Sequence, residues 1–218
     1  MDLFPLYNSI RIAIISTILI FFMGVFLAYQ IKKLPNEAKG VLDVILTLPL
    51  VLPPTVIGFF LLKVLGPNSF IGQTFASIPL VMRWYSAIFA CVIVSFPLMY
   101  RTSRAAFENF DENIIFAGKT LGKSNTWIFW RLIIPNSKNE ILAGLILAFS
   151  RSLGEYGATS MIAGYIPNKT ATISTTIYQF WRIGNDSLAY RWAIINIIIS
   201  FTVLFVLNMF EKNKVKWC

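Results

Sequence analysis

The sequence predicts an all-α polytopic membrane protein with about five transmembrane helices. Apolar residues make up 56% of the 218-residue chain and charged residues only 13%, whereas a soluble domain carries roughly a quarter charged residues. The mean hydropathy is +0.68, yet the net charge is +9. A membrane protein with basic cytoplasmic loops accounts for both properties, whereas a nucleic-acid-binding protein would account only for the charge.

Five apolar runs are each close to the roughly 20 residues that cross a bilayer as a helix. They cover residues 9–31, 44–62, 84–100, 141–165 and 192–210. The second, third and fifth runs contain no charged residue, the first has Arg11 at its edge, and the fourth is interrupted by Arg151 and Glu155. Trp84 and Tyr100 stand at the two ends of the third run, as is typical of the membrane interface. We therefore expect a single transmembrane domain over residues 1–218.

The positions of lysine and arginine predict an outside N-terminus and a cytoplasmic C-terminus, because cytoplasmic loops carry the excess of these residues. Twelve cationic residues fall on one side of the five runs and six on the other. The twelve follow the first run, follow the third run or lie in the C-terminal tail: Lys32, Lys33, Lys39, Arg101, Arg104, Lys119, Lys123, Arg131, Lys138, Lys212, Lys214 and Lys216. We expect a multi-pass protein of the cell membrane.

The missing residue types argue against an enzyme. Without histidine the chain has no imidazole base or imidazole metal ligand, and its two cysteines are too few for a cysteine-only zinc site. No GxxxxGKS/T phosphate-binding loop occurs in the sequence. We therefore expect a transport subunit with no catalytic residue, metal or cofactor of its own.

Residues 101–139 form a predicted cytoplasmic loop that is too long for a tight connection. Its apolar residues recur at helical intervals: Ala106, Phe110, Ile114, Ala117 and Leu121. Gly122 suits the end of this helix, and residues 125–133 form a second helical stretch before Pro135 opens the next helix. Such a basic amphipathic segment either lies on the lipid headgroups or docks a cytoplasmic partner.

The segment over residues 116–135 resembles the EAA loop of ABC importer permeases. The family pattern is Glu-Ala-Ala, three residues, Gly, nine residues, Ile, any residue and Leu-Pro, and the spacing here matches it throughout. The matching positions are identical at Ala117, Gly122 and Pro135 and substituted at Phe116, Gly118, Leu132 and Ile134. The resemblance implies the type I permease fold, in which this loop forms coupling helices that fit a cleft of a separate ATPase subunit.

The resemblance also implies which residues contact the ATPase. They are Phe116, Ala117, Gly118, Leu121, Gly122, Leu132 and Pro135. ATP and Mg²⁺ would then be bound by the partner ATPase rather than by this chain.

Two further stretches resemble the permease subunit of molybdate importers, which is close to the sulfate and tungstate permeases. They are Leu-Pro-Leu-Val-Leu-Pro-Pro-Thr-Val-Ile-Gly at residues 48–58 and Arg-Ser-Leu-Gly-Glu-Tyr-Gly-Ala at residues 151–158. The first is specific to the molybdate branch, whereas the second is shared with sulfate permeases. The resemblance covers nearly the whole chain and implies import of molybdate, with sulfate or tungstate as the alternative.

The residues of the first stretch support a role at the pathway on their own. Pro49, Pro53 and Pro54 remove backbone donors from a membrane helix, so the freed carbonyl groups need neighbouring helices or water as partners. The segment is therefore either a packing kink or part of the lining of a cavity. We assign Pro53, Pro54 and Thr55 to the translocation pathway.

Arg151 and Glu155 are the charged residues within a predicted span, where each costs about 2.5–3.5 kcal/mol on insertion scales. They are four residues apart, so they share a helix face and can pair. The pair either holds the bundle together or lies beside the pathway and exchanges partners during gating. Gly144, Gly154 and Gly157 should let other helices approach closely. We assign Arg151, Gly154, Glu155 and Gly157 to pathway and gating.

The resemblance further implies the partners. Two copies of the chain would form a homodimer in the lipid bilayer with the pathway on its two-fold axis, together with two ABC ATPase subunits and an extracytoplasmic oxyanion-binding protein. No nucleic-acid partner is expected.

The rival functional class is a stand-alone channel or secondary transporter, but such transporters often show internal repeats and several intramembrane ionisable groups. Here we find one charged pair and no visible repeat.

Overall fold

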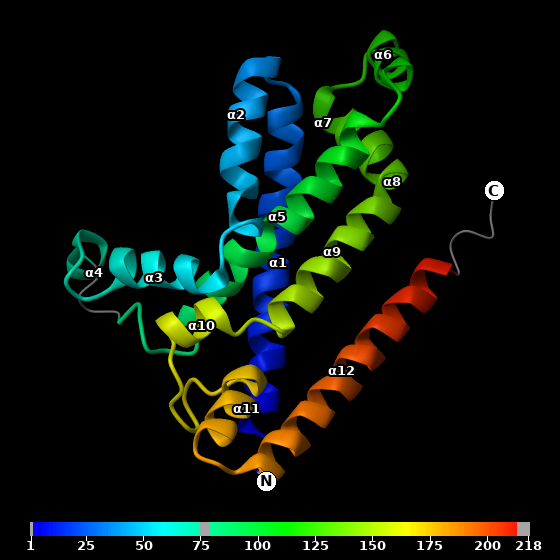
Figure 1. The fold of residues 1–218 in the computed structure, drawn as a ribbon. Helices are drawn as coiled ribbons and strands as arrows, with labels where there is room; N and C mark the ends of the chain where they lie inside the picture. Colours follow the sequence, from blue (N-terminus) through cyan, green and yellow to red (C-terminus); the bar gives the residue numbers. More distant parts are fainter. Residues whose placement is uncertain (1, 75–78, 213–218) are drawn as a thin grey trace.

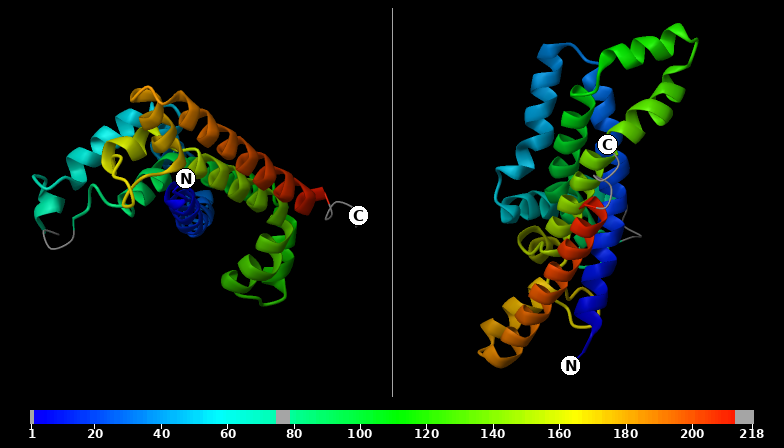
Figure 2. Two further views of the ribbon diagram at one scale, coloured as in Figure 1. Left: turned by 90° about the horizontal axis from the view of Figure 1, so that it is seen from below. Right: turned by 90° about the vertical axis from the view of Figure 1, so that its right-hand side faces the viewer.

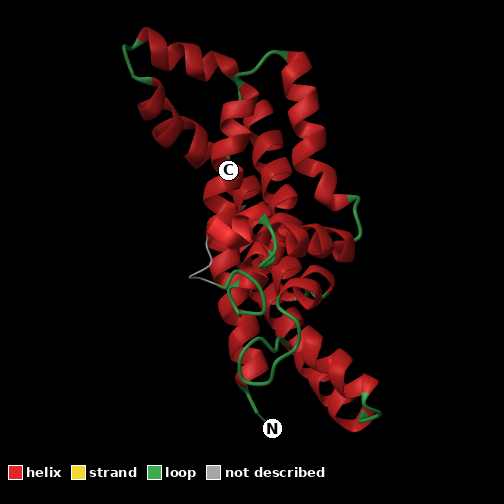
Figure 3. Ribbon diagram, turned by 90° about the vertical axis from the view of Figure 1, so that its left-hand side faces the viewer, coloured by secondary structure: helices red, strands yellow, loops and turns green. Residues whose placement is uncertain are grey.

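The computed structural model describes residues 2–74 and 79–212, and every regular element within them is helical (Figures 1 and 3). The elements are α1 (Phe4–Lys32), α2 (Asn36–Thr47), the 3₁₀ turn η1 (Leu48–Leu50), α3 (Pro54–Leu65), α4 (Phe70–Thr74), α5 (Ser86–Glu108), α6 (Glu112–Thr120), α7 (Asn125–Ile128), the π-helical turn η2 (Phe129–Ile133), α8 (Ile134–Asn136), α9 (Lys138–Leu153), α10 (Gly157–Ile162), α11 (Ile173–Arg182) and α12 (Asp186–Lys212). Lys214 and Lys216, two of the expected cytoplasmic cations, lie outside the described residues.

α5 lies at the centre of the fold, because both α1 and α9 pack along it (Figure 1). Met99 and Phe107 of α5 are completely buried there. Glycines make the close packing possible. A Cβ atom on Gly24 of α1 would lie 2.8 Å from Cγ of Met99, and one on Gly144 of α9 would lie 2.0 Å from Oγ1 of Thr102. A methyl group at either position would therefore require the side chain of Met99 or Thr102 to shift.

Three helices are long and apolar enough to cross a membrane by themselves: α1, α5 and α12. α1 and α12 contain the predicted spans 9–31 and 192–210, and α5 contains all of the predicted span 84–100 except its first two residues. α5 also continues to Glu108, about two turns beyond the predicted boundary, and so forms the first part of the long loop. Two bent pairs of helices bring the number of possible spans to five.

The second expected span, residues 44–62, is not one straight helix. The segments Asn36–Leu50 and Pro54–Leu65 meet at an angle of 104°. The break falls where two consecutive prolines follow a 3₁₀ turn, and the residue before a proline is driven out of the helical conformation. Pro53 accordingly has an extended backbone, with φ −55° and ψ 134°. The prolines therefore redirect the chain rather than bend a continuous helix.

The fourth expected span, residues 141–165, is also interrupted. α9 ends at Leu153, and α10 begins only at Gly157. The bent pair in this part of the chain is instead Asn125–Asn136 with Lys138–Leu153, at 73°. Pro135 lies at this bend, directly after the π-helical turn. A missing N–H group and a π-turn are two established causes of helix bending.

Hydrogen bonds join the start of α11 and the residues before it to the first turns of α1. Nδ2 of Asn8 donates a hydrogen bond to the carbonyl of Ala171 at 3.0 Å, and Oγ of Ser9 accepts one from the N–H of Ile173 at 2.8 Å. α12 then runs back along α11 and α9 (Figure 1). Its residues Ile197 and Phe201 are exposed in the single chain, which suits a helix that faces lipid or a second copy of the chain.

Candidate functional site

The two sequence stretches that resemble oxyanion permeases meet in space, where α3 packs against α10. A Cβ atom on Gly157 would lie 2.9 Å from Cβ of Pro54 and 3.2 Å from the backbone nitrogen of Thr55. One on Gly58 would lie 2.8 Å from Cα of Ala158. These close contacts join residues that are about one hundred positions apart in the chain. They place Pro54, Thr55 and Gly157 in a single junction.

The prolines of this junction start α3. Pro54 occupies the first turn of the helix, where its missing N–H group costs nothing. The carbonyl of Pro53 accepts hydrogen bonds from the N–H groups of Val56 and Ile57 at 2.9 and 3.3 Å. Thr55 and Pro53 are exposed in the single chain. The side that they face is thus open to solvent, lipid or a second copy.

Arg151 and Glu155 form an ion pair, with 2.6 Å between Nη1 of Arg151 and Oε2 of Glu155. The Glu155 residue is only 3% exposed, whereas 34% of the Arg151 side chain is exposed. The other carboxylate oxygen, Oε1, accepts a hydrogen bond from the N–H of Ala158 at 2.8 Å. Glu155 therefore links the end of α9 to the first turn of α10, and its charge is balanced by an arginine at the edge of the core.

The three glycines expected at helix contacts behave differently. Gly144 and Gly157 allow close approach, as expected. A Cβ atom on Gly154 would instead meet only the carbonyl of Ser150, at 3.7 Å, so no other helix requires a glycine there. Gly154 follows the last residue of α9, and its N–H group bonds to the Ser150 carbonyl at 3.2 Å. Its place in the structure is at a helix end.

The α3–α10 junction gives a stability prediction. We expect Gly58→Ala and Gly157→Ala each to lower the free energy of unfolding by about 1–3 kcal/mol, because the new methyl group would overlap a backbone or proline atom. Gly40→Ala is the matched control, since Gly40 is helical and its added Cβ would meet no atom within 4 Å in the described part of the chain. The measurement is the thermal unfolding midpoint in detergent. Equal midpoints for all three variants would contradict the packing described.

The loop that resembles a coupling segment is built from two capped helices joined by a left-handed turn. Asp111 caps α6 by accepting a hydrogen bond from the N–H of Asn113 at 2.9 Å. Gly122 ends it with φ +69°, and the N–H of Lys123 bonds back to the Gly118 carbonyl at 3.1 Å. This is the hydrogen-bonded ending that glycine favours. It confirms the predicted helix end at Gly122 and fixes the angle at which the chain enters α7.

The apolar periodicity over residues 106–121 is divided between two helices rather than one. α5 ends at Glu108 and α6 starts at Glu112. The capping carboxylate of Asp111 provides the new start, and acceptors of this kind are typical of helix N-termini. The loop therefore turns sharply at residues 109–111, and Figure 2 shows α6–α8 standing away from the main body of the bundle.

The seven predicted coupling residues do not share one environment. Gly118 is buried, because a Cβ atom there would lie 3.1 Å from Cγ1 of Ile128, and Leu132 is half-buried. The others are exposed: Phe116, Ala117, Leu121, Gly122 and Pro135. Phe116 is 57% and Leu121 74% exposed. Gly118 thus lets α6 pack against Ile128 of α7 and Leu132 of η2, while the exposed residues are available to a partner.

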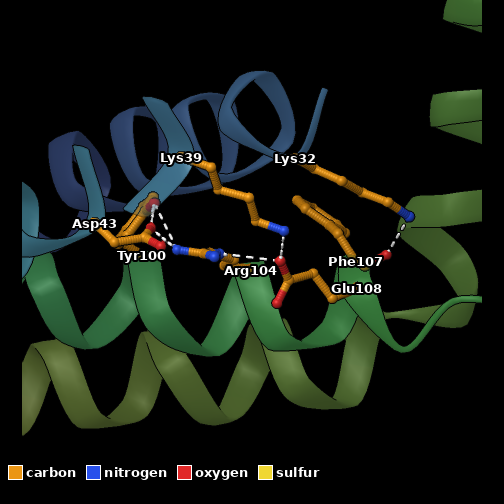
Figure 4. A network of polar contacts seen from close by, with 7 residues as sticks. All are labelled: Lys32, Lys39, Asp43, Tyr100, Arg104, Phe107 and Glu108. Atoms are coloured by element: carbon orange, nitrogen blue, oxygen red, sulfur yellow. Dashed lines mark hydrogen bonds and ion pairs between the residues drawn. The ribbon is translucent and has the colours of Figure 1, made fainter. Parts of the chain in front are cut away.

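A charged cluster between α2 and α5 was missed by the sequence interpretation (Figure 4). Arg104 forms ion pairs with Asp43 and with Glu108, the latter at 3.2 Å between Nε and Oε1. Lys39 pairs with the same glutamate, and the hydroxyl of Tyr100 donates to Asp43. The available signal was the four-residue spacing within each pair Lys39/Asp43 and Arg104/Glu108, but that spacing does not indicate that the two helices face each other.

Arg104 is therefore expected to hold α2 against α5. Replacing it with methionine removes its contacts with Asp43 and Glu108 and should destabilise the fold by about 2 kcal/mol, the range of hydrogen bonds to charged groups. Arg101→Met is the control on the same helix, because Arg101 is exposed, and we expect it to cost less than about 0.5 kcal/mol. Thermal unfolding of both variants tests this, and equal losses would contradict it.

The chain is thus an all-helical membrane domain with a projecting capped loop and an ion pair at the edge of its core, and comparison with known proteins identifies its class. The chain belongs to the family of binding-protein-dependent transport system inner membrane components, whose family model matches residues 12–214. It is thus a permease component located in the inner membrane, and ATP hydrolysis falls to a separate subunit.

Individual relatives are similar over nearly their whole length. The chain is 36% identical to the putative molybdenum transport system permease protein YvgM of Bacillus subtilis, covering 94% of this chain and 91% of that protein. It is 35% identical to the molybdenum transport system permease protein ModB of Escherichia coli (strain K12), covering 91% and 88%. A chain in the crystal structure of a bacterial ABC transporter involved in the import of the polysaccharide alginate shares the fold, with a TM-score of 0.80 and 16% identity over 97% of this chain and 79% of that one.

Proposed function

We propose that this chain is the permease subunit of an ATP-driven importer of molybdate. The observation that carries the proposal is the similarity to two molybdenum transport permeases over about nine tenths of the chain. The residue stretches 48–58 and 151–158 support it, because they resemble oxyanion permeases and pack together at the α3–α10 junction. Sulfate or tungstate is the alternative substrate.

The substrate is tested by uptake into proteoliposomes that contain the permease, its ATPase and its binding protein. We expect radiolabelled molybdate to accumulate and a tenfold excess of sulfate to leave the rate nearly unchanged. Equal inhibition by unlabelled sulfate and unlabelled molybdate would contradict the molybdate assignment. Separate measurements of the affinity of the binding protein for molybdate and for sulfate show how much of the substrate selection is made by that subunit.

The loop over residues 101–139 is proposed to dock the ATPase subunit. The support is its exposed apolar surface, since Phe116 and Leu121 are each more than half exposed on a segment that stands away from the bundle. Large exposed apolar side chains of this kind mark interaction sites. The left-handed turn at Gly122 holds the two helices of the loop at a fixed angle, so that movement of the ATPase can be passed to α5 and α9.

A cross-linking experiment tests this docking. Leu121→Cys, in a chain with Cys91→Ala and Cys218→Ser, should form a cross-link to the ATPase with a short bifunctional reagent in membranes that contain the whole transporter. Lys169→Cys is the control, because Lys169 is exposed and lies on the proposed outer side. Cross-linking of both positions, or of neither, would contradict the proposed orientation or the dock.

The pathway is proposed to run beside the α3–α10 junction and the Arg151–Glu155 pair, at the axis of a homodimer. Two facts support this. Pro53 and Thr55 are exposed in the single chain, and intramembrane ion pairs usually face a bundle interior or an aqueous path.

The binding protein would dock at the opposite side from the coupling loop, near α11, where Tyr178 and Trp181 are exposed.

A further inference from the structure

Two hollows meet between the C-terminal end of α1 and the coupling loop. One, of about 340 Å³, is lined by Lys32, Lys33 and Lys119 together with the acidic Glu112. The other, of about 390 Å³, is lined mainly by apolar side chains of α1 and of the segment α7–α8. Tyr29, Lys33 and Asn125 line both, so the two hollows adjoin along these residues. One end of the combined groove is cationic and the other is apolar.

The lysines at the cationic end are available for an anion. Lys33 and Lys119 are exposed, and among the side chains described, those of residues 2–74 and 79–205, none forms an ion pair with the three ammonium groups. Lys32 donates to the carbonyl of Phe107 at 2.5 Å, and Lys33 to Oε1 of Gln30 at 3.0 Å. Each ammonium group has three donors, so both can also bind a phosphate. Even with Glu112 counted, the net charge of the lining is positive.

The apolar end is exposed to the surroundings of the bundle. Phe22 and Phe26 of α1 are 63% and 59% exposed, and Trp130 on the opposite wall is 61% exposed. A soluble ion would gain nothing from this surface, whereas a hydrocarbon chain would bury it. Tryptophan at such a position is also typical of the interface between hydrocarbon and headgroups.

We propose that this groove binds one anionic phospholipid, with its headgroup phosphate among Lys32, Lys33 and Lys119 and an acyl chain between α1 and the α7–α8 segment. Basic pockets between helices at the cytoplasmic side suit acidic headgroups. The bound lipid would connect α1 to the coupling loop. The proposal rests on the proposed function in one respect, the cytoplasmic placement of the loop.

Native mass spectrometry of the purified full-length chain tests the headgroup. We expect the wild-type chain to retain phosphatidylglycerol about 10-fold more than phosphatidylcholine, since each lysine near the phosphate adds to the preference. Lys33→Gln with Lys119→Gln should remove that preference. Lys63→Gln with Lys169→Gln, two exposed lysines away from the groove, should keep it. A wild-type chain without preference, or a preference that survives in the groove variant, would overturn the proposal.

Fluorescence quenching tests the acyl chain without relying on the lysine variants. Phosphatidylglycerol brominated on its chains should quench the emission of Trp130, measured as the difference between the wild-type chain and Trp130→Phe. Absence of that difference would show that a second copy or another surface covers the groove, and would overturn the proposal. Neither measurement requires the ATPase or an oxyanion. If the proposed transport function proved wrong, the lipid result would still hold. If the lipid result proved wrong, the proposed transport function would still hold.

Discussion

Replacing Arg151 with leucine should be among the most damaging single substitutions in this chain. It leaves the carboxylate of Glu155, which is 3% exposed, without its partner 2.6 Å away. Breaking a buried ion pair costs roughly 3–5 kcal/mol, and the partial exposure of Arg151 lets water recover some of it, so we expect a loss of about 2 kcal/mol. The measurement is the thermal unfolding midpoint in detergent, together with the amount of protein in the membrane.

The double variant Arg151→Leu with Glu155→Gln separates stability from transport. Glutamine carries no charge, yet its side-chain oxygen can still accept the hydrogen bond that the N–H of Ala158 now gives to Oε1 at 2.8 Å. We therefore expect most of the lost stability to return. If the pair acts in gating, as proposed, oxyanion uptake should stay well below the wild-type rate. If the stable double variant took up oxyanion at the wild-type rate, the pair would have only a structural role and the proposed role in gating would be contradicted.

Replacing Gly122 with arginine should reduce ATP-driven uptake about 5- to 30-fold without preventing membrane insertion. Gly122 has φ +69°, and a left-handed conformation costs other L-residues about 1–2 kcal/mol, which corresponds to that range of populations. The expected loss of uptake does not come from a steric clash, since no atom of residues 2–74 or 79–212 is found within 4 Å of a Cβ added at Gly122. The strain would shift the angle between α6 and α7, on which the dock depends.

Gly122→Asn is the matched control, because asparagine tolerates the left-handed conformation better than other residues with a side chain. We expect its uptake to remain within about twofold of the wild-type rate, since asparagine adopts the left-handed conformation at helix ends at a lower cost than arginine does. Equal losses in both variants would indicate that the ATPase contacts the glycine surface itself. Equal activity would indicate that the turn is not needed for coupling.

Features governed by local chemistry could be predicted from the sequence. The apolar runs gave α1, α5 and α12 because a helix that crosses a bilayer needs a continuous apolar length. Gly122 was recognised as a helix end, since few residues other than glycine adopt its conformation. The spacing of four residues predicted the Arg151–Glu155 contact, but the expected single helix was wrong, because α9 ends at Leu153 and Glu155 lies between α9 and α10.

Features governed by long-range packing could not be predicted in the same way. Proline removes a hydrogen-bond donor in either case, so the sequence alone did not distinguish a kink at Pro53 and Pro54 from the observed 104° break. The outcome depends on α10 packing against α3, which requires Gly58 to face Ala158. The ion pair between Asp43 and Arg104 likewise joins two helices whose relative position no local pattern specifies.

ATP-driven import of molybdate is tested most directly by measuring molybdate accumulation in sealed proteoliposomes with and without the ATPase subunit. Permease, binding protein, molybdate and ATP are present in both preparations, with ATP on the side of the coupling loop. We expect accumulation against a concentration gradient only when the ATPase is included, and loss of that accumulation when ATP is replaced by ADP. Molybdate entry at the same rate without the ATPase would contradict ATP-driven import and would indicate a channel or secondary transporter.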